Sequence, residues 1–429
     1  MSVWRHITNL TVLVGARLGG AALGVAGQLV LTRLFAPDDV GLVFLAMSAT
    51  AFVSLFMTAG YPTLSIAYLA RYHSLGRKKL VEAFSAAARK ESMIASLAVL
   101  AALALGMAIL PLAGGNIEAL AYGGLAAIPY AVIRLNSSAA NALKRFSLSY
   151  VPDFVFRPGL LLAAIGAFAL WRLPFPIAWV LWAYVAITFV VAAWQAWAMG
   201  SESITSLKGR HAGDRLLKPY RKRAWALVIV ALVTLTFADV VTLLAGLFLP
   251  RADVAVLGIA IRLAALVGFI TQASQQFVMR DLTSAMAKGN DAETKILLLR
   301  TNLTSLGVMA CALAGAAVLG EFALSVFGQQ YRAGYWPLML FLLSQTLRAA
   351  GGMNAHLLSL DGHQVRSAGM CIIAVSALVC ASAILAPFLG ILGIAIAAVL
   401  AELVWAVLLA MLTQKLTGRR GDVFAVLKG

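Results

Sequence analysis

Apolar runs long enough to cross a bilayer recur along almost the whole 429-residue chain, and they constrain its fold more than any other feature. Hydrophobic residues make up 62% of the sequence and charged residues only 12%. An apolar run of about 20 residues spans the hydrocarbon core of a membrane as an α-helix, whereas a water-soluble domain needs alternating polar and apolar faces. The sequence therefore predicts an all-α polytopic membrane protein.

Twelve such runs are predicted, and the basic segment 201–223 at the midpoint of the chain divides them into two lobes of six helices. We assign residues 1–200 to an N-terminal lobe, 224–413 to a C-terminal lobe and 414–429 to a tail. We expect the two lobes to surround a central cavity. The spans lie near residues 10–34, 40–61, 92–113, 119–143, 155–171, 177–199, 224–248, 254–279, 298–320, 335–358, 366–387 and 391–413.

An internal repeat supports this division into halves. The segment Leu34–Val40 (LFAPDDV) resembles Leu247–Val254 (LFLPRADV), with one inserted residue and an offset of about half the chain. Arg134 and Arg348, on the fourth and tenth predicted spans, are separated by the same interval. Repeats of this kind are common among membrane transporters, where each half is one structural unit.

The net charge of +17 arises mainly from cations between the spans. With the N-terminus placed in the cytoplasm, most of the 34 Lys and Arg residues, Arg157 included, fall in cytoplasmic segments. This is the positive-inside pattern, and it predicts that both termini are cytoplasmic. The basic balance then indicates contact with anionic membrane lipids and no nucleic-acid partner.

Four arginines lie deep inside the apolar spans, where a charge needs a physical reason. They are Arg17, Arg134, Arg262 and Arg348. A guanidinium at the bilayer centre costs at least about 2.5–3.5 kcal/mol, so such residues usually face a bundle interior or a water-filled cavity. They either line a cavity that receives an anion or hold helices together by pairing with acids and carbonyls. Arg17 and Arg262 are the better cavity candidates, and both interpretations stay open for the other two.

Acids inside the spans are fewer than these arginines. Asp239 and Glu402 are the two central ones, which favours an anion-receiving cavity for the set. A buried carboxylate either takes up a proton or a cation, or is the fixed partner of an arginine. Both roles stay open for Asp239, and the fixed-partner role is favoured for Glu402. Polar residues that share helix faces with the arginines are expected to line the cavity: Gln28, Tyr130, Asn141, Gln272 and Gln276.

Several stretches resemble one family of membrane proteins, the bacterial polysaccharide-export (O-antigen, Wzx-like) flippases. This family belongs to the multidrug/oligosaccharidyl-lipid/polysaccharide exporter superfamily. The similar pieces keep the family's order along most of the chain. They are QLVLTRLFAPDDVGLVFLA at Gln28–Ala46, PDFVFRPGLLL at Pro152–Leu162, TFADVVTLLAGLF at Thr236–Phe248, FGQQYRAGYWPL at Phe327–Leu338 and LLSLDGHQ at Leu357–Gln364.

The resemblance implies a bundle of six plus six helices with a cationic cavity. It implies a transporter of the bacterial inner membrane that flips a polyprenyl-diphosphate-linked oligosaccharide repeat unit by alternating access, for lipopolysaccharide or exopolysaccharide synthesis. Related flippases carry cavity arginines on their first and eighth helices, where Arg17 and Arg262 stand here. Glycosyltransferases and a polysaccharide polymerase would be its pathway partners.

Two other functions compete with this interpretation. A multidrug cation antiporter of the same superfamily would have a similar fold, but cationic substrates favour a cavity lined with carboxylates. A membrane glycan polymerase or ligase would carry catalytic residues on long external loops, which this chain lacks. The sequence shows no nucleotide-binding loop, metal-ligand spacing or nucleophile arrangement, so we predict no enzyme activity, no cofactor and no metal.

Overall fold

The computed structural model describes residues 2–109, 116–170, 175–204, 214–287, 291–360, 363–418 and 421–423. Within these ranges the chain is helical and contains no strand, so the predicted all-α fold is confirmed. The chain divides into two compact units, Met1–Ala231 and Leu232–Gly429. The finer boundaries of the predicted linker and tail remain a prediction.

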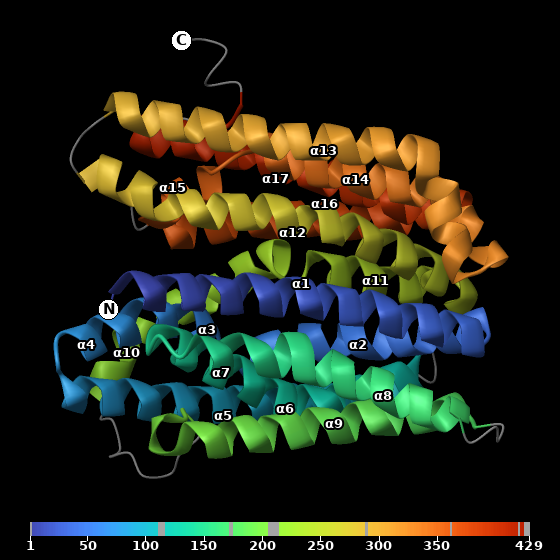
Figure 1. Cartoon of the computed structure of the whole chain (residues 1–429), viewed down its shortest axis with the longest axis horizontal. Helices are drawn as coiled ribbons and strands as arrows, with labels where there is room; N and C mark the ends of the chain where they lie inside the picture. Colours follow the sequence, from blue (N-terminus) through green and yellow to red (C-terminus); the bar gives the residue numbers. More distant parts are fainter. Residues whose placement is uncertain are drawn as a thin grey trace. The chain divides into compact units, whose positions relative to one another are not determined.

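The first unit contains the first six predicted spans (Figure 1). Several of its helices are interrupted by π-helical or 3₁₀ segments, here called η. Its elements are α1 (Ser2–Leu34), α2 (Pro37–Met57), α3 (Tyr61–Leu64), η1 (Ser65–Leu69), α4 (Ala70–Ser74), α5 (Lys78–Ile109), α6 (Ile117–Ala142), α7 (Phe146–Val151), η3 (Pro152–Phe156), α8 (Arg157–Leu170), α9 (Ile177–Met199), η4 (Gly200–Glu202) and most of α10 (Asp214–Thr234).

The second unit begins in the last turn of α10 and contains the rest of the seventh predicted span and the five that follow it. Within it, α17 packs against α14 and α16, and α13 packs against α12 and α14. Its elements are α11 (Phe237–Phe248), α12 (Arg251–Ala287), α13 (Asp291–Phe327), η5 (Gln329–Gly334), α14 (Tyr335–Ala350), α15 (Asn354–Leu360), α16 (Gln364–Leu389) and α17 (Ile391–Thr417).

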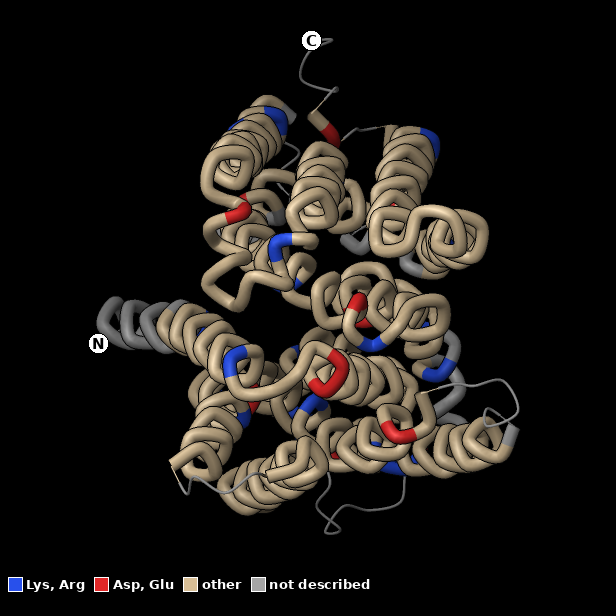
Figure 2. Tube along the Cα trace, turned by 90° about the vertical axis from the view of Figure 1, so that its right-hand side faces the viewer, with Lys and Arg blue, Asp and Glu red and all other residues tan. Residues whose placement is uncertain are grey.

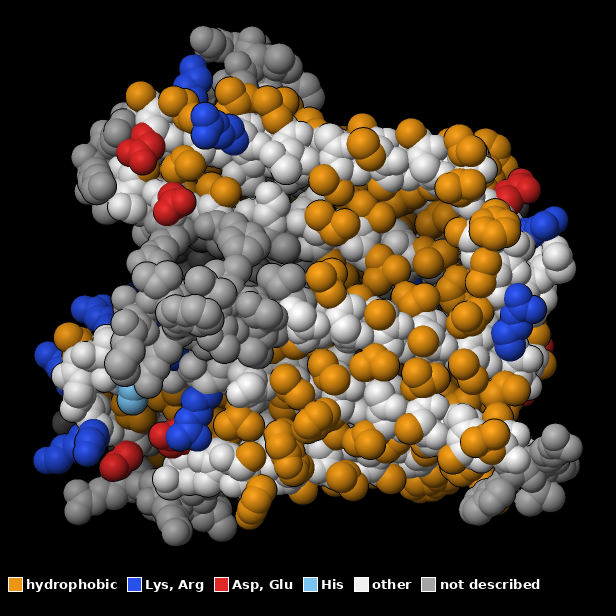
Figure 3. Space-filling model, viewed as in Figure 1, with side chains coloured by type: hydrophobic (Ala, Val, Ile, Leu, Met, Phe, Trp, Pro, Cys, Tyr) orange, Lys and Arg blue, Asp and Glu red, His pale blue; other side chains and the backbone are white. Residues whose placement is uncertain are grey.

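The outer faces of these helices suit a lipid environment. In the described residues, eight helices are long and apolar enough to cross a membrane, or nine if one bent pair is counted as a single span. On the face shown in Figure 3, hydrophobic side chains cover the sides of the helices, and charged side chains gather toward their ends. Exposed apolar side chains of this extent are typical of lipid contact. The protein is a multi-pass membrane protein.

The repeated Pro–Asp segments lie at equivalent turns of the two units. Pro37 occupies the first turn of α2, together with the acidic residue Asp39. In the second unit α11 ends at Phe248, and α12 carries Asp253 in its first turn. Proline suits a first turn because N–H groups there have no intrahelical acceptor, so the missing proline N–H costs nothing. An acidic side chain in the first turn interacts favourably with the positive end of the helix dipole. Both turns therefore follow from local sequence.

The seventh predicted span is broken. Its two parts, Arg223–Thr234 and Phe237–Phe248, are bent by 72° relative to each other. The break lies just after the chain enters the second unit. Interruptions inside a membrane are tolerated only where neighbouring groups satisfy the freed backbone donors and acceptors.

A second break separates α14 from α15, and the chain's C-terminal segment covers it. The Met353 N–H donates to the Gly421 carbonyl at 3.1 Å, and the Val423 N–H donates to the Ala350 carbonyl at 3.1 Å. The segment Gly421–Val423 therefore supplies backbone partners that the interrupted helix has lost.

Two buried asparagines complete this attachment. Asn354, which is 0% exposed, accepts a hydrogen bond from the Gly421 N–H through Oδ1 at 2.8 Å. Asn302, which is 1% exposed, donates to the Gly421 carbonyl at 3.0 Å. Gly352, in the turn between α14 and α15, has a φ of +61°, and a Cβ added there would lie 2.1 Å from the Gly421 carbonyl oxygen. Only glycine fits this turn.

We expect Gly352→Ala to destabilise the second unit. The left-handed conformation alone costs an L-residue roughly 1–2 kcal/mol, and the new methyl group would push the C-terminal segment away. The apparent melting temperature in detergent should fall by several degrees. Gly369→Ala on α16 is the matched control, because a Cβ there meets no atom within 4 Å. Equal melting temperatures for the two variants would contradict the proposed attachment.

Candidate functional site

Arg17 lies half-buried on α1 against an aromatic platform. Its guanidinium carbon is 5.4 Å from the centre of the Tyr150 ring and 5.9 Å from that of Phe154. These distances are typical of cation–π contacts, which stabilise a cation in a weakly solvated place. Asn141 holds the platform by donating a hydrogen bond to the Tyr150 hydroxyl at 2.8 Å. Two predicted site residues, Arg17 and Asn141, thus share this part of the first unit.

A glycine brings α1 close enough to form that platform. A Cβ added at Gly20 would lie 2.2 Å from the backbone oxygen of Phe154. Phe154 belongs to η3, a π-helical segment that interrupts the helix running from Phe146 to Leu170. Such π-bulges re-aim side chains and occur frequently at functional sites. The small residue and the bulge together determine what Arg17 contacts.

A second cation, Arg157, lies beside this platform in an ion pair. Its Nη2 is 2.9 Å from Oδ1 of Asp153, and the two side chains are only 18% and 21% exposed. The guanidinium carbon lies 4.2 Å from the centre of the Tyr130 ring, and Nη1 donates to the Tyr184 hydroxyl at 3.4 Å. The Tyr130 hydroxyl donates to Asp153 Oδ2 at 3.3 Å. The group forms a connected polar network.

The position of Arg157 differs from the sequence prediction. We counted it among cytoplasmic cations because the fifth apolar run begins near residue 155. The structure continues the helix back to Phe146, so that Arg157 lies inside an apolar helix of 25 residues. The spacing of Asp153 and Arg157, four residues apart on one helix face, was the signal for this ion pair. Hydropathy alone does not reveal this ion pair, because packing determines where the helix begins.

Arg134 approaches the same network from α6. Its Nη1 donates to the Ala51 carbonyl and to the Ser54 hydroxyl of α2, both at 3.3 Å. Its guanidinium carbon is 5.9 Å from the centre of the Tyr130 ring. Arg134 therefore links α6 to α2 and contacts the tyrosine that also lies against Arg157.

These residues form one group, which we call the arginine cluster. It holds three guanidinium groups and, among the described residues, one carboxylate. Figure 2, which looks along the helices, shows Lys/Arg and Asp/Glu positions on several of them. The cluster consists of Arg17, Tyr130, Arg134, Tyr150, Asp153, Phe154, Arg157 and Tyr184.

In the second unit, Arg348 has a carboxylate partner. Its Nη2 donates to Glu402 Oε1, and the Glu402 side chain is 0% exposed while that of Arg348 is 23% exposed. The same Nη2 donates to the Val233 carbonyl at 3.0 Å. The structure thus gives the pair a fixed-partner geometry, a role that the sequence favoured for Glu402 and left open for Arg348.

The other predicted residues of this unit are more dispersed. Arg262 is half-buried on α12, and its Nη1 donates to the Gly258 carbonyl of its own helix at 3.1 Å. Asp239 lies in the first turn of α11 and is half-buried. Gln272 is half-buried on α12, whereas the side chain of Gln276 lies outside the described residues. In the first unit, Gln28 is half-buried on α1.

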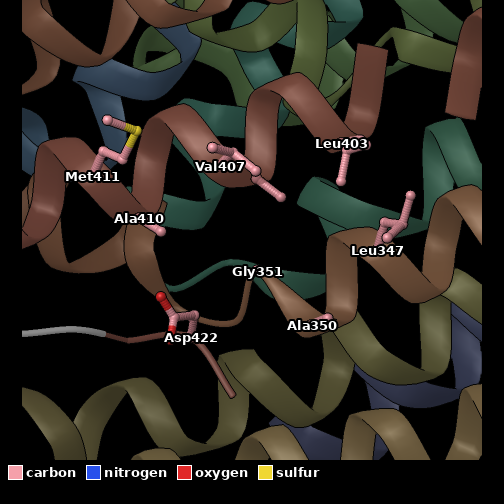
Figure 4. Close-up of a pocket in the computed structure, with 9 residues that line it drawn as sticks. Leu347, Ala350, Gly351, Leu403, Val407, Ala410, Met411 and Asp422 are labelled. Carbon is pink, nitrogen blue, oxygen red and sulfur yellow. The ribbon is translucent and has the colours of Figure 1, made fainter. Parts of the chain in front are cut away.

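A cavity of about 170 Å³ lies between α14 and α17 of the second unit (Figure 4). Its walls are apolar apart from Asp422 of the C-terminal segment. None of the predicted site residues lines it. The described residues also contain no group of three His, Cys, Asp or Glu side chains placed to hold a metal ion.

Neither a scan against protein-family models nor a search of curated proteins returned a match. Solved structures are informative about the fold. An inward-facing multidrug resistance MATE family transporter of the MOP superfamily matches with a TM-score of 0.75 at 14% identity, over 95% of this chain and 96% of that chain. The lipid II flippase MurJ in an inward closed conformation matches with a TM-score of 0.70 at 13% identity, over 94% and 87%.

A MOP superfamily transporter from Pyrococcus furiosus, described as having a binding pocket of reverse polarity, is also similar. Its TM-score is 0.68 at 13% identity, over 95% of both chains. The chain has the fold of the MOP superfamily transporters. The first unit carries the arginine cluster, and the predicted two-lobed fold agrees with these structures.

We expect Gly20→Ala to disturb the Arg17 platform. Its methyl group would overlap the Phe154 carbonyl and force α1 away from η3, and overpacking of this kind typically costs about 1–3 kcal/mol. The apparent melting temperature should fall. The neighbouring Gly19 has no atom within 4 Å of an added Cβ, so Gly19→Ala should leave it unchanged or raise it slightly. A larger effect at Gly19 would contradict the described packing of α1.

Proposed function

We propose that this protein is a flippase for a polyprenyl-diphosphate-linked oligosaccharide. It would move the repeat unit from the inner to the outer leaflet of a bacterial inner membrane for surface or exopolysaccharide synthesis, by alternating access. The observation that carries the proposal is the charge of the arginine cluster, where three guanidinium groups accompany one described carboxylate, Asp153. A partly buried excess of positive charge favours an anionic substrate.

The geometry of the cluster suits a diphosphate. A planar guanidinium presents several N–H donors in one plane, which matches the oxygen atoms of a phosphate group. When the flat face of Arg17 or Arg157 lies against a tyrosine ring, those donors point sideways from the ring. In this proposal the aromatic rings position the two cations, and phosphate oxygens would bind the guanidinium N–H groups.

Asp153 has a defined part in this proposal. It partly neutralises Arg157 at a distance of 2.9 Å, which lowers the cost of keeping the cation in an apolar helix before substrate arrives. An incoming diphosphate would then compete with Asp153 for the same guanidinium. Such competition allows release as well as binding, which a transporter needs.

We also propose roles for the remaining predicted residues and for the pathway partners. Arg262 stays a candidate diphosphate-binding cation of the second unit, and Asp239 would be the ion-coupling carboxylate. With both termini in the cytoplasm, the basic segment 201–223 would face cytoplasmic lipid headgroups. Glycosyltransferases would supply the substrate, and a polymerase would consume it after translocation.

The fold alone does not choose between substrates. The similar structures include both a multidrug resistance transporter and a lipid II flippase. A cation antiporter remains the alternative of the same fold, and the sign of the charge in the arginine cluster counts against it. The choice therefore depends on local electrostatics.

We expect Arg17→Gln to reduce flipping strongly while the protein remains folded. Loss of a charge-assisted hydrogen bond of about 1.5–3 kcal/mol corresponds to a fall of roughly 10- to 100-fold in rate. The measurement is translocation of a fluorescent polyprenyl-diphosphate oligosaccharide in proteoliposomes, with melting temperature recorded in parallel. Arg33→Gln, at the exposed end of the same helix, is the control and should retain activity.

The same proteoliposomes separate the alternatives. Export of a lipophilic cationic dye without flipping of the labelled lipid would favour the cation antiporter and end the flippase proposal. Formation of longer glycan chains from the labelled lipid would indicate a polymerase. Normal flipping by Arg17→Gln would remove this arginine from the substrate site.

A further inference from the structure

We propose that Arg348 is a positioning residue, which together with Glu402 clamps the broken seventh span at its break. The clamp rests on the contacts within the second unit. Only its transport readout rests on the function proposed above. In this view the donors of Arg348 serve a backbone carbonyl at the break and a buried carboxylate, and the residue does not bind substrate.

The break leaves polar backbone groups in an apolar setting. α10 ends at Thr234 and α11 starts at Phe237, so carbonyls in the last turn of α10 lose their intrahelical partners. In a membrane an unsatisfied backbone group costs several kcal/mol, and water does not reach it. The Thr236 hydroxyl donates to the Leu232 carbonyl at 3.4 Å, and the next carbonyl, that of Val233, takes its donor from a neighbouring helix.

Arg348 supplies that donor from α14. It contacts both sides of the break, because Nη2 donates to the Val233 carbonyl at 3.0 Å and the guanidinium carbon lies 5.4 Å from the centre of the Phe237 ring. Val233 is the residue before the end of α10, and Phe237 is the first of α11. One side chain thus spans the interruption.

Glu402 on α17 holds this arginine in place. Its side chain is 0% exposed, and Arg348 donates to its Oε1. The second carboxylate oxygen, Oε2, has no hydrogen-bond partner among the described residues. The buried carboxylate therefore depends on Arg348, and the direction of the guanidinium depends on the carboxylate. α11 also packs against α16 and α17, so the part of the span beyond the break is attached to this unit.

The neighbouring backbone restricts Arg348 further. α14 ends at Ala350, two residues later, where the C-terminal segment bonds to the Ala350 carbonyl through Val423. This attachment orients the last turn of α14, which carries Arg348. The related residue Arg134 lies in the interior of α6 and bonds to α2. The two sequence-related arginines consequently do different structural work.

A double-mutant cycle tests the clamp. Arg348→Met leaves the Glu402 carboxylate buried without its cation, and we expect the apparent melting temperature to fall by roughly 10 °C. Glu402→Met should lower the melting temperature less, because Arg348 keeps its hydrogen bond to the Val233 carbonyl. The double variant Arg348→Met/Glu402→Met removes both charges and should recover most of the loss, because well-packed apolar residues often replace a buried ion pair without cost.

Two further readouts separate positioning from general stability. Hydrogen–deuterium exchange of the peptide covering residues 232–240 should accelerate in Arg348→Met more than exchange in α1. Arg348→Lys should keep the charge pairing with Glu402 but lose the planar guanidinium that lies near the Phe237 ring, giving intermediate exchange. Lipid flipping by the double variant should recover together with its melting temperature.

Each result decides the proposal. A double variant that regains its melting temperature but flips lipid as poorly as Arg17→Gln would show that Arg348 contacts substrate, and the positioning role would be overturned. Single variants with unchanged stability and exchange would show that the clamp does not form. If the wild-type protein flips no labelled lipid, the proposed function fails, while the melting and exchange results still test the clamp.

Discussion

The cost of holding a guanidinium in an apolar helix bundle determines how the interior of this protein is built. An arginine cannot lose its proton there, so the surrounding chain must provide charge, acceptors or aromatic faces. Arg17 lies against two rings, Arg134 reaches a carbonyl and a hydroxyl, and Arg157 pairs with Asp153. Arg348 uses all three kinds of contact. Each solution requires groups from other turns or helices, which is why the cations lie where helices meet.

The same requirement applies to the backbone at the two breaks of the second unit. The Val233 carbonyl receives a donor from Arg348, and the Ala350 carbonyl receives one from Val423 of the C-terminal segment. The breaks are therefore stabilised by defined partners and do not indicate general flexibility. Because Arg348 lies in the last turn of α14, the two breaks are neighbours in structure although they are far apart in sequence.

Topology alone does not distinguish functions within this fold. Similar structures at 13–14% identity include a multidrug resistance transporter, a lipid II flippase and a transporter described by the reverse polarity of its pocket. The fold accommodates these differences because its helices supply a scaffold whose interior side chains vary. For this chain the decisive feature is the excess of guanidinium groups over carboxylates in the arginine cluster. That excess is the basis for proposing an anionic, diphosphate-bearing substrate.

The sequence by itself determined the two-lobed helical membrane fold and placed Arg17, Arg134, Arg262 and Arg348 within apolar runs, because apolar length and proline-marked turns are local properties. Only the tertiary structure decided their partners. Arg348 and Glu402 are 54 residues apart in sequence, and Arg157 entered the interior because packing, not hydropathy, sets where its helix begins. Pairing energies depend on distance and burial, which no periodicity in the sequence specifies. The predicted roles of Arg262 and Asp239 remain predictions for the same reason.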